Sequence, residues 1–146
     1  MFEKILMPSD GSEYALRAAT YGADIAKKYN SQLTLLYVVE LPPVIGIPPS
    51  DELQEAMRQD LAGRGREALD KTREIYERMG IPTVDDILFG SAVPSIINFA
   101  RDGAFDLVVI SSRGAGTGAI EQILIGSVAE GILHGAPCPV LMIRPC

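Results

Sequence analysis

Five short apolar runs, separated by segments with helical character, constrain the fold of this chain more than any other feature of its sequence. Each run is nearly continuous in apolar and β-branched residues, which is typical of strands covered on both faces in a parallel sheet. Strands that alternate with helices imply right-handed crossovers. The sequence therefore predicts an α/β fold in which a doubly wound parallel sheet carries helices on both faces. The predicted strands are residues 5–7, 33–39, 84–88, 107–111 and 140–143.

Helix boundaries follow from polar caps. Ser12 can accept a hydrogen bond from a first-turn amide, which predicts a helix over Glu13–Tyr29. Ser50, followed by two acidic residues, predicts a long helix that continues to Met79. Gly63 and Gly65 each weaken that helix by about 1 kcal/mol relative to alanine, so a bend or break there is an alternative to a continuous helix. Shorter helices are predicted from Pro94 to Arg101 and from Val128 to His134.

Composition excludes several classes of protein. The 146 residues form one predicted domain, 1–146, large enough to bury about 70% of the surface of the unfolded chain. A net charge of −6 argues against a nucleic-acid partner, because binding to a polyanion depends on clustered Lys and Arg. No apolar run approaches the roughly 20 residues of a membrane span, so no membrane partner is expected. No signal peptide is visible, and Cys138 and Cys146 lack metal-ligand or disulfide spacing, which favours a cytoplasmic location.

One stretch of the chain has the elements of a phosphate site. A predicted strand ends at Ser111, the glycine-rich loop 113–118 follows, and a predicted helix starts after Gly126. Glycine lets the backbone approach an anion closely, and the amides of a first helical turn point at it. In an open α/β sheet the ligand binds outside the carboxyl ends of the strands. Because the loop 8–10 also follows a strand, both loops are expected at that end of the sheet.

Four motifs, in this order along the chain, carry a family resemblance: Ile-Leu-Met-Pro-Ser-Asp-Gly-Ser at 5–12, Gly90, Gly-Ser-Val-Ala-Glu at 126–130 and Ala-Pro-Cys-Pro-Val-Leu at 136–141. With them the sequence resembles the universal stress protein family over essentially its whole length. The resemblance implies a five-stranded, Rossmann-like sheet with strand order 3-2-1-4-5. It also implies a homodimer joined through the last strand, Val140–Ile143, which is apolar and suited to edge pairing.

The resemblance further implies a stress-response or signalling protein that binds ATP or AMP and acts as a homodimeric switch. ATP hydrolysis, if present, would be slow, and no catalytic residue or protein metal site is predicted. Any Mg²⁺ would be held by the nucleotide phosphates and water. By resemblance, Asp10 meets the adenosine moiety beside Pro8 and Ser9, and the Val38 backbone faces the adenine. The ribose and phosphates would be lined by Ile110, Ser111, Arg113, Gly114 and Gly116 and closed over by Gly126, Ser127 and Val128.

The phosphate loop departs from the family pattern, which is written Gly-x2-Gly-x9-Gly-Ser/Thr. Counting back from Gly126 places Gly116 at the second glycine, but Arg113 then occupies the position of the first. Aligning the strand end instead places Ser111 and Gly114 at the two positions and leaves two extra residues before Gly126. We prefer the second alignment because it keeps the strand in register. The altered spacing is the main support for an alternative, a dimeric protein-interaction module that does not bind nucleotide.

Each candidate residue also has a purely structural interpretation. Ser127 and Glu130 have the spacing of a capping box, which would only cap a helix. Asp10 would only shape a turn or cap the first helix, and Arg113, the predicted phosphate cation, would be solvent-exposed. The loop glycines would only supply positive φ in a surface turn. His134 is expected to act as a partner of the helix dipole, and Cys138 as a structural residue.

Three enzyme or module classes are disfavoured by the motifs. Efficient phosphoryl transfer needs positioned cations, yet no lysine follows Lys71 and no Gly-x4-Gly-Lys-Ser/Thr loop is present. A phospho-acceptor receiver module would need an acidic pair after the first strand, where only Asp10 stands. A dinucleotide-binding site would place its glycines after the first strand, whereas the glycines at 114, 116 and 118 follow the fourth.

Overall fold

The parallel sheet places its first strand at the centre. The computed structural model describes residues 1–114 and 125–145, and its five parallel strands lie in the order β3-β2-β1-β4-β5, as predicted. β1 pairs with β2 on one side, with Pro8 opposite Leu36, and with β4 on the other. The order reverses at β1, so the carboxyl ends of β1 and β4 border the crevice in which ligands of such sheets bind. The strands are β1 (Lys4–Pro8), β2 (Gln32–Val39), β3 (Thr83–Phe89), β4 (Leu107–Ser111) and β5 (Val140–Ile143).

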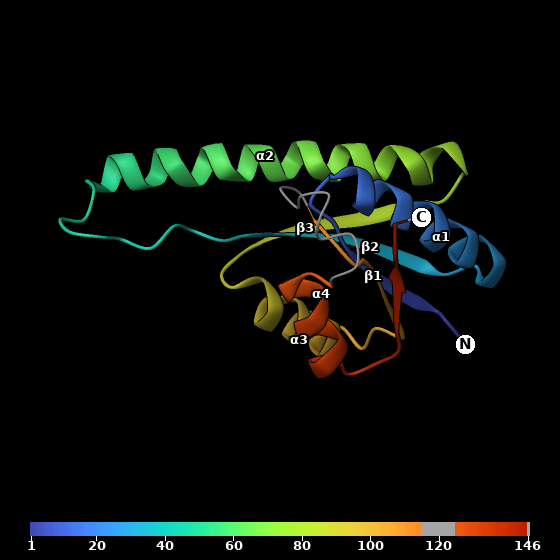
Figure 1. Cartoon of the computed structure of the whole chain (residues 1–146). Coiled ribbons are helices and arrows are strands. Elements are labelled where there is room, and N and C mark those ends of the chain that lie inside the picture. Colours follow the sequence, from blue (N-terminus) through green and yellow to red (C-terminus); the bar gives the residue numbers. More distant parts are fainter. Residues whose placement is uncertain (115–124, 146) are drawn as a thin grey trace.

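Helices cover both faces of the sheet. α1 (Glu13–Tyr29) and α2 (Asp51–Arg78) lie on one face, and α3 (Ala92–Asp102) and α4 (Ser127–Gly135) lie on the other (Figure 1). The alternation of side chains along β1 divides the core accordingly, since Ile5 and Met7 pack on the α1 and α2 side and Leu6 packs on the α3 and α4 side. The doubly wound architecture predicted from the sequence is confirmed.

The α1 helix has the predicted boundaries. The Ser12 hydroxyl accepts a hydrogen bond from the Ala15 amide at 3.2 Å, and Asn30 ends the helix in a left-handed conformation with φ of 53°. Both caps satisfy backbone groups that a helix end leaves without intrahelical partners. The buried face consists of small residues, which let the helix lie close to the sheet. These residues are Ala15, Ala18, Ala19, Gly22, Ala23 and Ala26.

The α2 helix is continuous through both of its glycines, so the expected alternative of a break is wrong. Gly65 has a packing reason, because a Cβ there would lie 2.5 Å from the Tyr37 ring. At Gly63 no atom of the described residues lies within 4 Å of the Cβ position, so packing against them does not explain this glycine. No helix among the described residues is both long and apolar enough to cross a membrane.

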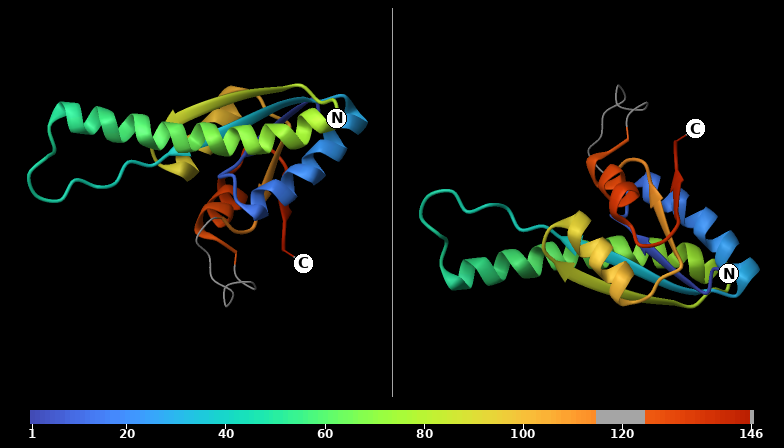
Figure 2. Two further views of the ribbon diagram at one scale, coloured as in Figure 1. Left: turned by 90° about the horizontal axis from the view of Figure 1, so that it is seen from above. Right: turned by 90° about the horizontal axis from the view of Figure 1, so that it is seen from below.

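The first turns of α2 and the proline-rich loop before them project past the sheet (Figures 1 and 2). We call this projection the arm, residues 41–57. As the proline content predicts, its loop 41–49 contains neither helix nor strand. The apolar loop side chains reach solvent, with Ile45 exposed to 90% and Ile47 to 93%. Leu53 in α2 is also exposed, because the helix extends beyond the sheet that would cover it.

Candidate functional site

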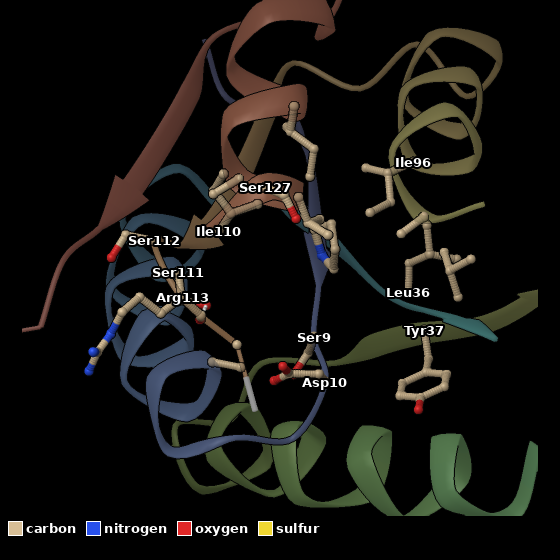
Figure 3. A pocket seen from close by; sticks show the side chains of 18 residues that line it. Ser9, Asp10, Leu36, Tyr37, Ile96, Ile110, Ser111, Ser112, Arg113 and Ser127 are labelled. Atoms are coloured by element: carbon tan, nitrogen blue, oxygen red, sulfur yellow. Dashed lines mark hydrogen bonds between the residues drawn. The ribbon is translucent and has the colours of Figure 1, made fainter. Parts of the chain in front are cut away.

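A cavity of about 370 Å³ opens at the carboxyl ends of β1 and β4. The loop after β1 forms one side, with Ser9 and Asp10, and the start of α4 with Ser127 lies opposite (Figure 3). Leu36 and Ile96 close a third side. Cavities of about 300–1,000 Å³ that are largely apolar, with a few convergent polar groups, are typical of small-molecule sites. The cavity therefore has the place, size and lining of a ligand site.

The loop after β1 is held by side-chain hydrogen bonds. The Asp10 Oδ1 atom accepts from the Ser12 amide at 2.9 Å, so this carboxylate does shape the turn before α1. The Ser9 hydroxyl accepts from the Gly11 amide at 3.2 Å and lies 2.7 Å from the Thr72 hydroxyl of α2. Asp10 also lines the cavity, so its turn role and a ligand role are compatible.

The loop after β4 brings Gly114 against Asp10. A Cβ at Gly114 would lie 2.6 Å from the Asp10 Oδ2 atom, so only glycine fits here without moving the carboxylate. Gly114 does not have a positive φ. A close approach, and not turn geometry, therefore explains this glycine, and the turn interpretation is wrong for it.

Arg113 is buried, with 4% of its surface exposed, and its guanidinium lies over the Tyr14 ring at 4.2 Å from the centroid. The solvent-exposed alternative for this residue is wrong. Although Arg113 is part of the cavity wall, its guanidinium points away from the space between Asp10 and Ser127 (Figure 3). A cation stacked on an aromatic face is attracted by the ring quadrupole, which holds it there.

The N-terminus of α4 faces the cavity, but its cap differs from the prediction. Gly126 is the N-cap residue and its amide donates to the Ser112 carbonyl at 2.7 Å, while no side chain among the described residues caps this helix. Ser127 is already the first helical residue, so the predicted capping box is wrong. The first-turn residues Ser127, Val128 and Ala129 line the cavity, and first-turn amides have no intrahelical partners. These amides, with the dipole of α4, form the positive side of the site.

The cavity brings together most of the residues predicted from the sequence. Gly126 is absent from the lining, although the next residue, Ser127, belongs to it, and Gly116 lies outside the described residues. The predicted residues that line the cavity are Pro8, Ser9, Asp10, Val38, Ile110, Ser111, Arg113, Gly114, Ser127 and Val128.

Among the described residues, sequence reasoning missed eight that line the cavity. Leu36 could have been inferred as a lining residue, because it pairs with the predicted Pro8 in the parallel register of β1 and β2. Ala129 and Ile132 lie on the same helix as the predicted Ser127, about one turn apart. The residues from α1 and α3 had no local signal. The missed set is Ala15, Leu36, Tyr37, Ala92, Ile96, Ser112, Ala129 and Ile132.

The remaining chemistry-bearing residues stand apart from the cavity lining. His134 is in the last turn of α4, the position from which the dipole role is predicted, and its Nε2 lies 3.9 Å from a Glu130 carboxylate oxygen. Burial and the nearby Asp106 carboxylate raise the pKa of the Cys138 thiol, which keeps it protonated and unreactive at neutral pH. Within residues 1–114 and 125–145, no three His, Cys, Asp or Glu side chains are grouped as metal ligands.

Comparison with known proteins gives consistent matches along the whole chain. The model of the Universal stress protein family matches residues 1–144. A universal stress protein from Methanocaldococcus jannaschii is 35% identical over 144 residues, which is 99% of this chain and 83% of the relative. The solved structure of universal stress protein UspA from Lactobacillus plantarum has a TM-score of 0.79 at 26% identity and covers 98% of both chains.

Two more distant structures of the same fold contain nucleotides. A universal stress protein family protein from Arabidopsis thaliana, solved with AMP bound, has a TM-score of 0.70 at 18% identity, covering 99% of this chain and 92% of that one. The universal stress protein from Archaeoglobus fulgidus, solved in complex with dAMP, has a TM-score of 0.69 at 21% identity, covering 99% and 100%. At these identities the likeness shows the shared fold.

Proposed function

The chain belongs to the universal stress protein family, and we propose that it binds an adenine nucleotide, ATP or AMP, in the cavity between the β1 loop and α4. The observation that carries the proposal is the placement of Asp10 and the α4 N-terminus on opposite sides of one cavity of about 370 Å³. A carboxylate accepts hydrogen bonds from hydroxyl or amino groups, and helical amides donate to phosphate oxygens. A nucleotide carries both kinds of group at its two ends. The bound AMP and dAMP of the two distant relatives support the same assignment.

The described residues favour binding over catalysis. The guanidinium that would neutralise phosphate charge is stacked on Tyr14, and efficient phosphoryl transfer depends on cations positioned around the transferred group. We propose that the chain is a nucleotide-dependent stress or signalling protein with slow ATP hydrolysis at most. Any Mg²⁺ would enter with the nucleotide, coordinated by its phosphates and by water.

Calorimetric titration of nucleotide-stripped protein with ATP and AMP, with and without Mg²⁺, tests the proposal. We expect a dissociation constant of about 10 μM or lower, which corresponds to about −7 kcal/mol. Ser127→Ala is expected to weaken binding severalfold, because the lost hydrogen bond contributes about 1 kcal/mol. Ser95→Ala is a matched control, since this α3 serine does not line the cavity. Absence of heat, together with no thermal stabilisation at millimolar nucleotide, would contradict nucleotide binding.

We also propose that the protein is a homodimer joined through β5, an edge strand of the sheet. The Pro139 carbonyl accepts a hydrogen bond from Val108 of β4, and the Ile143 carbonyl accepts one from Ser112 just after β4. Because alternate residues of a strand point their backbone groups in opposite directions, Met142 presents its amide to the open edge. Met142→Pro is therefore expected to remove an intersubunit hydrogen bond while it leaves the ladder to β4 intact.

Sedimentation at micromolar concentration checks the dimer. The unmodified chain is expected to sediment as a dimer and Met142→Pro as a monomer. Met142→Ala keeps the amide and removes most of the side chain, so it separates edge pairing from side-chain packing. A dimeric Met142→Pro variant would place the interface elsewhere.

A second candidate function is a protein-interaction module without nucleotide. The exposed apolar residues of the arm favour it, because contiguous apolar surface on a soluble domain is typical of binding sites for other proteins. The calorimetric result separates the two functions. A chain that binds no nucleotide but remains a folded dimer would be such a module.

A further inference from the structure

Thr72 is a fully buried polar side chain that the proposed function does not use. It lies in the C-terminal third of α2, with 0% of its surface exposed, and its hydroxyl faces the loop after β1. The Thr72 Oγ1 atom lies 2.8 Å from the Ala68 carbonyl oxygen and 2.7 Å from the Ser9 hydroxyl oxygen. Ser9 in turn lies 3.2 Å from the Gly11 amide. These contacts connect the loop that bears Asp10 to the helix that carries the arm.

The direction of each hydrogen bond in this chain of contacts is fixed by its two ends. A backbone carbonyl can only accept, so Thr72 must donate its proton to Ala68. The Thr72 oxygen then accepts from Ser9, whose own proton is thereby committed. A backbone amide can only donate, so Gly11 gives its proton to the Ser9 oxygen. The Ser9 hydroxyl therefore has no proton left to offer to a ligand.

We propose that Thr72 is a positioning residue that determines the specificity of the nucleotide site, an inference that rests on the function proposed above. By holding the Ser9 proton, Thr72 leaves the β1 side of the cavity with the Ser9 oxygen and the Asp10 carboxylate, both hydrogen-bond acceptors. This side selects ligand groups that donate, such as a hydroxyl or an amino group. It disfavours phosphate oxygens, because they too are hydrogen-bond acceptors. Phosphate oxygens bind instead to the donating amides of α4.

Two further contacts keep the acceptor side in place. A Cβ at Gly11 would lie 2.9 Å from the Ala68 Cα atom, so the loop touches the α2 backbone. Tyr37 belongs to the cavity lining, and its ring is directed toward α2, where it packs against Gly65 (Figure 3). Positions 65, 68 and 72 share one face of α2 at helical spacing. Packing therefore already holds the loop after β1 close to α2, and the hydrogen bond between Thr72 and Ser9 fixes the Ser9 hydroxyl within that loop.

The test compares two probe ligands, adenosine and inorganic pyrophosphate, in variants of the full chain. Thr72→Val has nearly the same shape but cannot accept the Ser9 proton, so we expect about tenfold weaker adenosine binding and unchanged or stronger pyrophosphate binding. Thr72→Ser keeps the hydroxyl and should restore both affinities. Thr34→Val removes the hydroxyl of another buried threonine, one outside the cavity, and should change neither affinity. A parallel loss for both probes in Thr72→Val would indicate a merely structural role and overturn the proposal.

A double-mutant cycle that combines Thr72→Val with Ser9→Ala tests whether Thr72 acts on the ligand through Ser9. If Thr72 acts through Ser9, the adenosine affinity of the double variant should equal that of Ser9→Ala alone, whereas independent effects would add. Additive effects would overturn the proposal.

Failure of this inference is distinguishable from failure of the proposed function. If the unmodified chain binds neither the two probes nor AMP, the proposed nucleotide binding is wrong, and so is the proposed role of Thr72 in specificity. If the unmodified chain binds and Thr72→Val binds equally well, only the role of Thr72 falls. Hydrogen exchange of the Gly11 amide in the ligand-free protein reports on the hydrogen bonds from Gly11 to Ser9 and from Ser9 to Thr72. The exchange rate should increase in Thr72→Val and stay unchanged in Thr72→Ser.

Discussion

Gly11→Ala is expected to lower the free energy of unfolding by about 2–5 kcal/mol. Gly11 has φ of +75°, a conformation that costs an L-residue about 1–2 kcal/mol. The new Cβ would also lie 2.9 Å from the Cα and Cβ atoms of Ala68, and overpacking costs about 1–3 kcal/mol. The denaturation midpoint in urea measures the loss.

Gly63→Ala is the matched control, because the same chemical change should act with the opposite sign. This glycine lies within α2 and has open space around its Cβ position. Alanine is favoured over glycine inside a helix by about 1 kcal/mol, so the control should be more stable than the unmodified chain. A Gly11→Ala variant of unchanged stability would show that the β1 loop is free to move away from α2.

Asp10→Ala is expected to weaken AMP binding by about 10-fold to 150-fold. A hydrogen bond to a charged group contributes about 1.5–3 kcal/mol, and the variant loses the charged acceptor on the β1 side of the cavity. It also loses the turn bond from the Ser12 amide. Calorimetric titration measures the affinity, and thermal unfolding of the free protein measures the contribution of the turn.

Asp10→Asn separates the two roles of this residue. The amide oxygen of asparagine can still accept from Ser12, so the turn and the stability should be retained. The carboxylate charge is lost, so AMP affinity should fall nearly as far as in Asp10→Ala. Normal affinity in Asp10→Asn would mean that the residue acts only through the turn.

Local signals predicted the elements of the fold well. The boundaries of α1 followed from Ser12, because a hydroxyl at that position satisfies a first-turn amide. The strands followed from apolar runs, and the structure extends β1 to Lys4–Pro8 by pairing with β2. Ser127 was misassigned as a cap because its spacing to Glu130 fits, although the backbone contact from Gly126 to Ser112 starts the helix one residue earlier.

Contacts between distant segments had no signal in the sequence. Arg113 has the position of a phosphate cation, but only the fold brings Tyr14 beneath its guanidinium. Likewise, 63 positions separate Ser9 from Thr72, and neither residue type indicates the other as a partner. Gly65 was expected to weaken α2, whereas the structure shows that it makes room for the Tyr37 ring.

The position of the cavity between distant parts of the sequence determines when the site can form during synthesis and folding. The β1 wall of the cavity contains Pro8, Ser9 and Asp10, whereas Ser127 and Ile132 of the opposite wall follow more than 100 residues later in the sequence. Domains generally fold as units during synthesis, starting from the N-terminal part. A nascent chain that has emerged only as far as β4 has no opposite wall. A nucleotide could therefore bind in this cavity only after α4 has also been synthesised and has packed on the sheet, so the site forms late in folding.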